Sequence, residues 1–328
     1  MKKTTTGIAR LGIALIVLAL TSVHAFAQTY PNKPLRFIVP YPAGGGTDII
    51  ARLIGAKLTD AWGQQVVVEN RAGASGILGN DLVAKSAPDG YTVLIGITTL
   101  VQMPHLNSKL PYEVFKDFTP VAQLALSSNL FAVPAASPAN NLKEFLALAR
   151  AEPQKYGSYG SFGAGTTAHL HGELFNLQTG LKLAHVPYKG GAPLATDLMG
   201  GQVSVGFLDL TSARAHLASG RMKFLAVSGT RRYAALPDVP TFAEQGLKDF
   251  EASGWFGLLL PGNAPKDITA RVGVEVARIL KLPDVQARIN DIGLQTVDTS
   301  PDAFAAAMKN DYAVWGRVVR EAQIKLEQ

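Results

Sequence analysis

Two glycine-rich junctions carry the residues best suited to binding chemistry, and the first lies between an apolar segment and a helical pattern. It reads VPYPAGGGTDIIAR over residues 39–52. Glycine admits φ angles that are closed to other residues and lets backbone N–H groups approach a ligand. The helix that follows begins with unpaired N–H groups and the positive end of its dipole, so the junction has the composition of an anion-binding site. Its candidate ligand-binding residues are Tyr41, Ala43, Gly44, Gly45, Gly46, Thr47 and Asp48.

The spacing of this first junction excludes the two common phosphate-binding motifs. No Gly-Lys-Ser/Thr follows the glycines, as a Walker loop requires, and the glycines are adjacent rather than spaced as G-x-G-x-x-G. Asp48 would repel a multiply charged phosphate. Taken alone, the stretch fits a tight turn capped by Thr47 or Asp48 equally well.

A second junction repeats the design of the first at residues 156–170, which read YGSYGSFGAGTTAHL. Two helix N-termini that face each other across a cleft would hold a small anion from both sides. A carboxylate suits a few N–H groups together with hydroxyl groups from Thr47 and the second junction. Phe162 and Tyr41 either line the pocket or pack within their lobes. The candidate residues of the second junction are Ser161, Phe162, Gly163, Gly165, Thr166 and Thr167.

Catalytic and metal-binding alternatives have little support. His169 and His171 are two positions apart, so on a helix they point to nearly opposite faces and are poorly placed to share a metal. The chain has no cysteine and no G-x-S-x-G nucleophile motif. Asp48 and Asp209 form a conceivable acid–base pair, but an aspartate at a helix start is more often a cap or an acceptor for a ligand amine. We expect no catalytic residues, no metal and no cofactor.

The elements that position these junctions alternate along the chain, as in an α/β fold with a mostly parallel sheet covered by helices. A helix is expected to open at Thr47 and Asp48. A last long helix, at about 301–323, carries an apolar stripe that indicates a core-facing side. The expected strands cover residues 35–39, 66–68, 93–97, 130–133, 155–159, 183–186, 203–208, 224–227 and 256–260.

Composition also indicates two lobes. The chain has 328 residues, more than one hydrophobic core usually serves. Polar breaks precede apolar strands at residues 127–129 and 251–254, so the chain is expected to cross twice between lobes. The expected division is lobe 1 from 28 to 128 and from 253 to 328, with lobe 2 from 129 to 252. Lobes joined in this way commonly close on a ligand by hinging at the crossover strands.

The first 27 residues have the three parts of a secretory signal peptide. Lys2, Lys3 and Arg10 are basic, residues 13–20 are apolar, and Ala-Phe-Ala at 25–27 fits a cleavage site, so cleavage is expected after Ala27. The apolar run is shorter than the roughly 20 residues that span a bilayer. Three of the chain's formal net +6 charges lie in this segment, and the other basic residues are scattered, which disfavours nucleic acid as a partner.

Several ordered blocks resemble the Bug family, the exported solute receptors of tripartite tricarboxylate transporters. The resemblance covers the whole chain after the signal peptide. Its blocks are YPNKPLRFIVP with PAGGGTD (30–48), VVENRAGASG (67–76), APDGYT (87–92), LPYEVFKDFTP (110–120), HVPYKGGAP (185–193) and LPDVPT (236–241).

This resemblance implies a periplasmic binding protein (type II-like) fold that closes on an organic carboxylate. In the family the two glycine loops hold one carboxylate, which maps onto residues 43–48 and 161–167 here. Asp209 matches a cleft position, and Thr98 with Thr99 lies at a further loop that reaches towards the ligand. The family varies at the distal end of the ligand, where Tyr41, Phe162 and Met103 would favour an apolar body.

The sequence therefore predicts a monomeric, non-enzymatic receptor in the periplasm that delivers a small carboxylate to a tripartite tricarboxylate transporter (TTT) permease. The alternative is a protein of the same fold that informs a sensor kinase of a two-component system, and the least favoured is a secreted α/β hydrolase. Dicarboxylates, tricarboxylates, amino acids, nicotinate-like acids and aromatic acids all remain compatible ligands. A β-branched residue at Gly163 is expected to weaken binding by obstructing the approach to its N–H.

Overall fold

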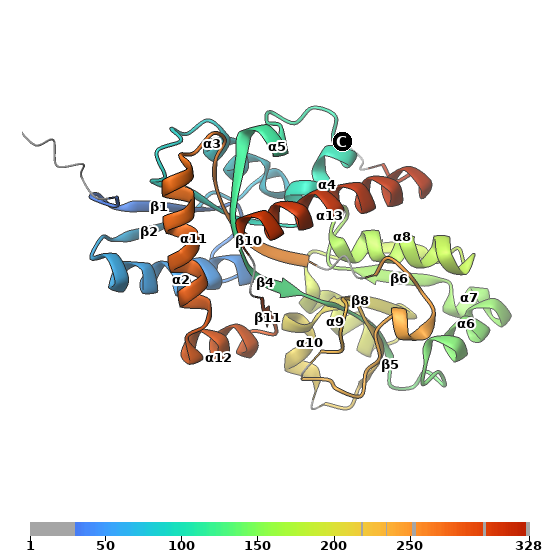
Figure 1. The fold of residues 1–328 in the computed structure, drawn as a ribbon. Helices are drawn as coiled ribbons and strands as arrows, with labels where there is room; N and C mark the ends of the chain where they lie inside the picture. The colour runs from blue at the N-terminus through green and yellow to red at the C-terminus, as the bar shows by residue number, and fades with distance from the viewer. Residues whose placement is uncertain (1–29, 218, 234, 251–253, 298–299, 326–328) are drawn as a thin grey trace, which may run out of the picture.

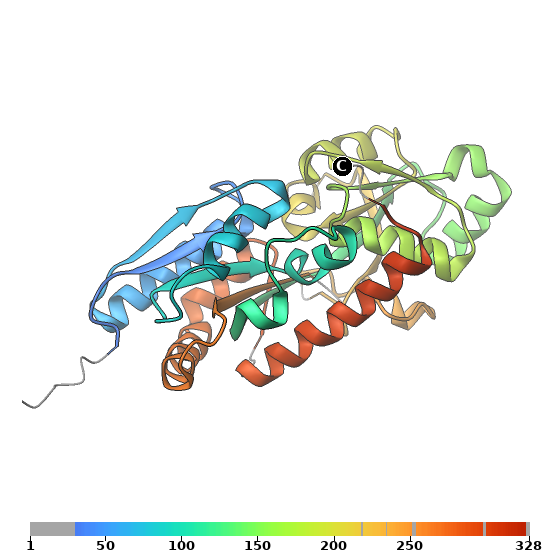
Figure 2. The same cartoon turned by 90° about the horizontal axis from the view of Figure 1, so that it is seen from above.

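The computed structural model describes residues 30–325 except 218, 234, 251–253 and 298–299. The predicted signal peptide and its cleavage after Ala27 lie outside these residues. The described strands form two sheets, A and B, each flanked by helices, and the two halves of the molecule lie side by side in Figures 1 and 2. The predicted α/β class with two helix-flanked sheets is confirmed.

Sheet A has six strands in the described part of the chain, in the order β11-β4-β10-β3-β1-β2. Strands β2, β1 and β3 are parallel, whereas β10 and β4 run antiparallel to their neighbours. The strands are β1 (Leu35–Val39), β2 (Val66–Asn70), β3 (Thr92–Ile97), β4 (Phe118–Ser127), β10 (Gly254–Pro261) and β11 (Gln295–Thr296).

Sheet B has five described strands in the order β7-β6-β8-β5-β9. Strands β7, β6 and β8 are parallel, and β5 is antiparallel to both β8 and β9. Both sheets are thus mixed rather than mostly parallel, because β10 in sheet A and β5 in sheet B each run antiparallel to the strands on both sides of them. The strands are β5 (Asn129–Pro134), β6 (Ser158–Ser161), β7 (Ala184–Pro187), β8 (Val205–Asp209) and β9 (Met222–Val227).

The chain passes from sheet A to sheet B between β4 and β5, and returns between β9 and β10. The predicted limit at 128/129 falls in the first of these connections, whereas the limit at 252/253 lies outside the described residues. The exact lobe division remains a prediction.

Two expectations for local structure were wrong. The strand expected at 155–159 begins too early, because Pro153 opens the short helix α7 (Pro153–Tyr156) and β6 starts only after it. Strand β4 was missed altogether. Its Pro120 lacks the N–H of a regular strand, and it pairs with Leu259 next to a register shift between Leu258 and Leu259.

The helices cover both faces of each sheet (Figure 1). The described α-helices besides α7 are α2 (Gly46–Trp62), α3 (Ile77–Ala84), α4 (Thr99–Leu106), α5 (Val114–Asp117), α6 (Leu142–Ala151), α8 (Thr167–Thr179), α9 (Gly191–Met199), α10 (Leu210–Leu217), α11 (Lys266–Leu280), α12 (Pro283–Asp291) and α13 (Pro301–Glu321). Short 3₁₀ turns lie at Ala74–Gly76 and Ala243–Gln245.

The alternation of side chains along β1 divides the core of sheet A into two layers. Phe37 and its same-face neighbours pack with apolar residues of α2 and α11, such as Ile54 and Val276. Ile38, on the opposite face, belongs to the cluster that includes residues of α4 and α13. Burial of this kind fixes α2, and therefore the glycine loop that precedes it.

Helix α13 runs along both halves of the molecule and contacts α4 and α8 (Figure 2). Its predicted apolar stripe is core-facing as expected: Phe304, Met308, Trp315 and Val319 are buried, and Tyr312 packs against the same cluster.

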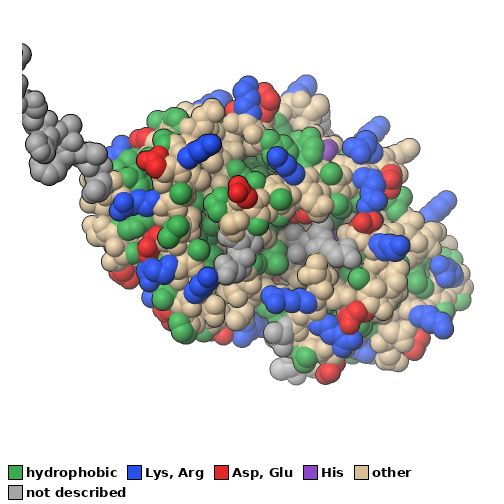
Figure 3. All heavy atoms as spheres, in the orientation of Figure 1, with side chains coloured by type: hydrophobic (Ala, Val, Ile, Leu, Met, Phe, Trp, Pro, Cys, Tyr) green, Lys and Arg blue, Asp and Glu red, His purple; other side chains and the backbone are tan. Residues whose placement is uncertain are grey.

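The surface carries no large patch of one charge sign on the face that Figure 3 shows. Basic side chains are scattered among acidic and neutral ones. None of the described helices combines the length and apolar character needed to cross a membrane.

Candidate functional site

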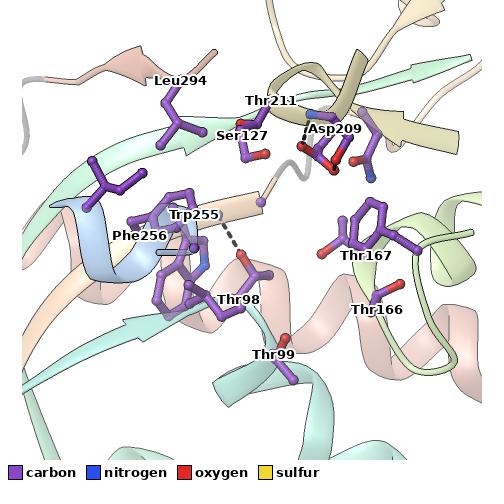
Figure 4. A pocket seen from close by; sticks show the side chains of 18 of the residues that line it. Thr98, Thr99, Ser127, Thr166, Thr167, Asp209, Thr211, Trp255, Phe256 and Leu294 are labelled. Carbon is purple, nitrogen blue, oxygen red and sulfur yellow. Dashed lines mark hydrogen bonds between the residues drawn. The ribbon is translucent and has the colours of Figure 1, made fainter. Parts of the chain in front are cut away.

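A cavity of about 360 Å³ lies between the two sheets, where both glycine loops meet (Figure 4). It is bounded by the N-termini of α2, α4, α8 and α10 and by the ends of β4 and β10 that cross between the halves. Of the predicted site residues, those that line it are Gly44, Gly45, Gly46, Thr99, Phe162, Thr166, Thr167 and Asp209.

Helix α2 starts at Gly46 on the cavity, with Gly45 as its N-cap and no side-chain hydrogen bond to cap it within the described residues. Asp48 does close the preceding turn, as the alternative of a capped tight turn expected, because its carboxylate accepts a hydrogen bond from the Gly44 N–H. Gly44 adopts a φ of 84°, a conformation that favours glycine. The loop presents backbone to the cavity, and the first N–H groups of the helix have no intrahelical partners.

Asp48 holds this first loop in shape rather than lining the cavity. Its buried carboxylate accepts hydrogen bonds from the Gly44 N–H at 3.0 Å, from Asn70 Nδ2 at 3.0 Å and from Arg52 Nε at 3.0 Å. Burial alone would raise the pKa of Asp48, but the hydrogen bonds from Arg52, Gly44 and Asn70, with the charge of Arg52, hold the pKa below its usual value. The negative charge of Asp48 is thus compensated by Arg52 and by hydrogen bonds inside the loop, and so it does not repel an anion in the cavity.

Helix α8 starts at the same cavity from the other sheet, with Thr166 as an N-cap that makes no side-chain capping bond to the described residues. Thr167, its first residue, lines the cavity as well. Two helices of 17 and 13 residues, one from each half, therefore both begin at one cavity without a side-chain cap. Their dipoles add favourably for an anion between them.

The N–H groups of two glycines in the second loop already have partners inside the protein. The Gly163 N–H donates to Ser161 Oγ at 3.2 Å, and the Gly165 N–H donates to His169 Nδ1 at 3.0 Å. The predicted mechanism for Gly163 thus needs correction. Gly163 has a φ of 150°, and a Cβ added there would lie 3.3 Å from the Thr166 methyl group. A side chain at this position therefore acts through backbone strain rather than by blocking a free N–H.

The remaining predicted residues lie outside the described cavity wall. Tyr41 packs against the sheet A core rather than lining the cavity. Thr47, Ser161 and Met103 are buried, and Ala43 is exposed. The predicted residues that the structure leaves off the wall are Tyr41, Ala43, Thr47, Asp48, Ser161, Gly163 and Gly165, together with Met103.

Asp209 lines the cavity at the end of β8 and caps α10. Its carboxylate accepts from the Ser212 N–H at 2.9 Å and from Ser212 Oγ at 2.8 Å. Each oxygen keeps a further acceptor position, which suits a ligand group that donates a hydrogen bond.

Sequence reasoning missed much of the wall. Trp255 and Phe256 follow the second polar break, and Ser127 and Asn129 belong to the first. The sequence identified these segments as crossings between the lobes but did not predict that they line the cavity. Thr98 was named only with the loop that reaches towards the ligand. The lining residues beyond the predicted set are Ile49, Ile97, Thr98, Ser127, Asn129, Thr211, Ser212, Gly254, Trp255, Phe256 and Leu294.

The wall combines an apolar side with a ring of hydroxyl groups. Trp255, Phe256 and Phe162 supply aromatic surface. None of the described residues that line the cavity is Lys, Arg or His, so backbone N–H groups and hydroxyls are its main donors. Such donors suit the modest charge of a carboxylate.

The histidines do not form a metal site in the described part of the chain, where no group of three or more His, Cys, Asp or Glu residues is placed to hold a metal. His169 stacks on His185, with ring centroids 3.9 Å apart. The Nδ1 atom of His171 lies 2.9 Å from the side-chain Nδ2 of Asn129. Ser161 Oγ lies 2.7 Å from His185 Nε2, but Ser161 is fully buried and off the cavity wall. The Ser161 hydroxyl of this pair is therefore not part of the described cavity wall.

Asp311 provides a pH-dependent test of the structure behind the cavity. This buried carboxylate accepts from Trp255 Nε1 at 3.0 Å, and burial raises its pKa to about 7 against the lowering effect of the Trp255 and Asn310 hydrogen bonds. An acid with a raised folded pKa contributes most stability below its unfolded pKa of about 4, and this contribution is lost as pH rises through 7. Relative to Asp311→Asn, the wild type should lose on the order of 3 kcal/mol of unfolding free energy between pH 4 and 8. Denaturant unfolding at several pH values measures this, and parallel pH profiles for the two proteins would contradict it.

Comparisons with known proteins agree with this geometry. Residues 50–324 match the model of the tripartite tricarboxylate transporter family receptor. BugT of Bordetella pertussis is 34% identical over 303 residues, which cover 92% of this chain and 93% of BugT. A solved R. palustris protein with adipate is 32% identical with a TM-score of 0.78, covering 90% of this chain and all of that one. MatC from Rhodopseudomonas palustris with bound malate is 31% identical with a TM-score of 0.74, covering 88% of this chain and all of MatC.

Proposed function

Because this chain belongs to the tripartite tricarboxylate transporter receptor family, we propose that it binds a small organic carboxylate in the cavity between its two sheets and delivers it to a TTT-type permease. We place the protein in the periplasm, as a monomer without enzymatic activity. In this proposal the lobes divide at residues 128/129 and 252/253, and they close on the ligand.

The observation that carries the proposal is the meeting of two uncapped helix N-termini at one cavity. α2 and α8 come from opposite halves, and both begin with residues of the cavity wall. A carboxylate between them would contact both halves at once. Since a ligand shifts a conformational equilibrium by its differential affinity, contacts to both halves favour the closed state.

The chemistry of the wall supports a carboxylate over a phosphate. The described wall has no cationic side chain, and its one acidic side chain is Asp209. A multiply charged phosphate needs stronger compensation than hydroxyls and a few N–H groups provide. The neighbours with adipate and malate have carboxylate ligands, which fits this choice.

A thermal-shift screen tests the proposal with adipate, malate, citrate, glutamate, nicotinate, benzoate and terephthalate. At least one should raise the unfolding temperature in a concentration-dependent way, because a ligand that binds only the folded state stabilises it. Nicotinamide and benzamide are matched uncharged controls and should shift it far less than nicotinate and benzoate. Equal shifts for an acid and its amide would contradict a carboxylate-specific site.

The transport role needs a separate measurement. Ligand uptake by membrane vesicles that contain the permease should require addition of the ligand-loaded protein. If uptake is unchanged by the protein while a sensor kinase responds to it, the signalling alternative replaces delivery.

A further inference from the structure

The hydroxyl groups of the second glycine loop differ in whether their protons are already used. Thr166 Oγ1 donates to the Gly163 carbonyl oxygen at 2.6 Å. Ser161 Oγ donates to the same carbonyl at 3.0 Å, lies 2.7 Å from His185 Nε2, and is fully buried. A hydroxyl has one proton to donate. Neither of these two side chains therefore has a proton to offer a carboxylate in the cavity.

Thr167 is the exception. It lines the cavity in Figure 4, and its Oγ1 accepts a hydrogen bond from Gln102 Nε2 at 3.0 Å. With one lone pair engaged by that amide, the hydroxyl proton is directed away from Gln102. The cavity lies on the open side of Thr167, so the proton is available to a bound anion.

Gln102 itself has no direct access to the cavity. It is fully buried in α4, and it is absent from the described cavity wall. Its Oε1 accepts no hydrogen bond from the described residues. A buried polar atom without a partner is uncommon and calls for an explanation. The amide therefore makes its described hydrogen bond through its donor end, to Thr167.

The Gln102–Thr167 bond also joins the two halves of the molecule. Gln102 lies in α4, which follows β3 of sheet A, and Thr167 opens α8, which follows β6 of sheet B. The bond therefore depends on how the two halves sit against each other at the cavity.

We propose that Gln102 is a positioning residue that turns the Thr167 hydroxyl into a donor for the ligand carboxylate. This inference rests on the proposed function, since it names how one group of that same site is prepared for the anion. Because this bond joins the two halves, the Thr167 hydroxyl is oriented as a donor only when α4 and α8 are in contact.

A double-mutant cycle tests the coupling. The variants are Gln102→Met, which keeps the length of the side chain but removes the amide, Thr167→Val, which removes the hydroxyl with little change of shape, and the double variant. Affinity is measured by calorimetry with whichever acid of the panel above binds the wild type most tightly. Each single variant should bind about tenfold more weakly, as expected for one hydrogen bond to a charged group. The double variant should bind no more weakly than Thr167→Val alone.

Two further variants separate this role from simple packing. Gln102→Glu keeps the shape and, when measured at about pH 9 so that the buried carboxyl group is ionised, offers only acceptors. Its carboxylate then takes the Thr167 proton, and affinity should fall further than in Gln102→Met. Asn80→Leu removes another buried amide, whose Nδ2 donates to the Tyr112 hydroxyl at 3.1 Å. Neither residue lines the described cavity, so this variant should leave affinity unchanged.

The outcomes distinguish this inference from the function on which it rests. Additive losses in the double variant, wild-type affinity in Gln102→Glu, or an equal loss in Asn80→Leu would overturn the positioning role while the carboxylate receptor stands. Failure of the wild type to bind any acid of the panel would overturn both.

Discussion

Replacing Gly46 by valine is expected to weaken carboxylate binding by about a hundredfold, which corresponds to about 3 kcal/mol. Gly46 is the first residue of α2 and lines the cavity, and a Cβ there would lie 3.4 Å from the Phe256 ring. The first carbon alone fits, but the two further methyl groups of valine must enter the space next to the helix N–H groups. Loss of hydrogen bonds to a charged ligand, at about 1.5–3 kcal/mol each, accounts for the size of the effect. Calorimetry with the best acid of the panel measures it.

The control for this substitution is Gly200→Val at the end of α9. Gly200 is exposed. A Cβ added there would have backbone oxygens of α9 as its nearest neighbours, at 3.5 Å. This variant should bind normally. If Gly46→Val binds within about threefold of the wild type, the N-terminus of α2 does not hold the ligand.

Replacing Phe131 by alanine is expected to lower the free energy of unfolding by about 4 kcal/mol. Phe131 is fully buried on β5 of sheet B, and the centroid of its ring lies 5.0 Å from that of Phe145, 4.9 Å from Phe175 and 5.3 Å from Phe207. Removing the ring leaves a cavity that these neighbours cannot fill without moving. Denaturant unfolding followed by circular dichroism measures the loss.

Phe115→Ala is the matched control, because the Phe115 side chain is 45% exposed although its ring also contacts another aromatic ring, that of Tyr312. Its cost should stay below about 1 kcal/mol. Similar costs for the two substitutions would mean that Phe131 is not the centre of a tightly packed layer.

The sequence predicted the position of the two glycine loops because the pattern that marks them is local. Runs of glycine before a helical pattern indicate where backbone approaches a ligand, and no distant residue is needed to see this. Gly44, Gly45 and Gly46 thus lie on the cavity wall as expected. The residue-by-residue contact with a ligand remains a prediction.

What the sequence could not predict depends on the directions of side chains and on residues far apart in the chain. The Gly163 and Gly165 N–H groups are taken by Ser161 and His169, and which N–H remains free is decided by side-chain directions that spacing does not encode. Likewise, Asp48 was considered as a helix cap, but its acceptor capacity goes to Asn70, 22 positions away, as well as to its neighbours in the loop.

The wall contributed by β4 and β10 was missed for a related reason. These strands pair with each other across more than a hundred residues of sequence. Pro120 and Gln123 interrupt the apolar pattern of β4, so its strand character follows from its neighbours rather than from its own composition.

Trp255 gives the protein an optical probe of its own. Of the three tryptophans in the sequence, Trp255 lines the cavity, whereas Trp62 and Trp315 are not among its described lining residues. The indole of Trp255 lies beside the cavity, and its N–H donates to the Asp311 carboxylate. Its emission therefore responds both to a ligand in the cavity and to a change of charge on Asp311. Unlabelled protein can therefore report occupancy of the cavity by fluorescence, and replacing Trp62 and Trp315 by phenylalanine would isolate the signal of Trp255.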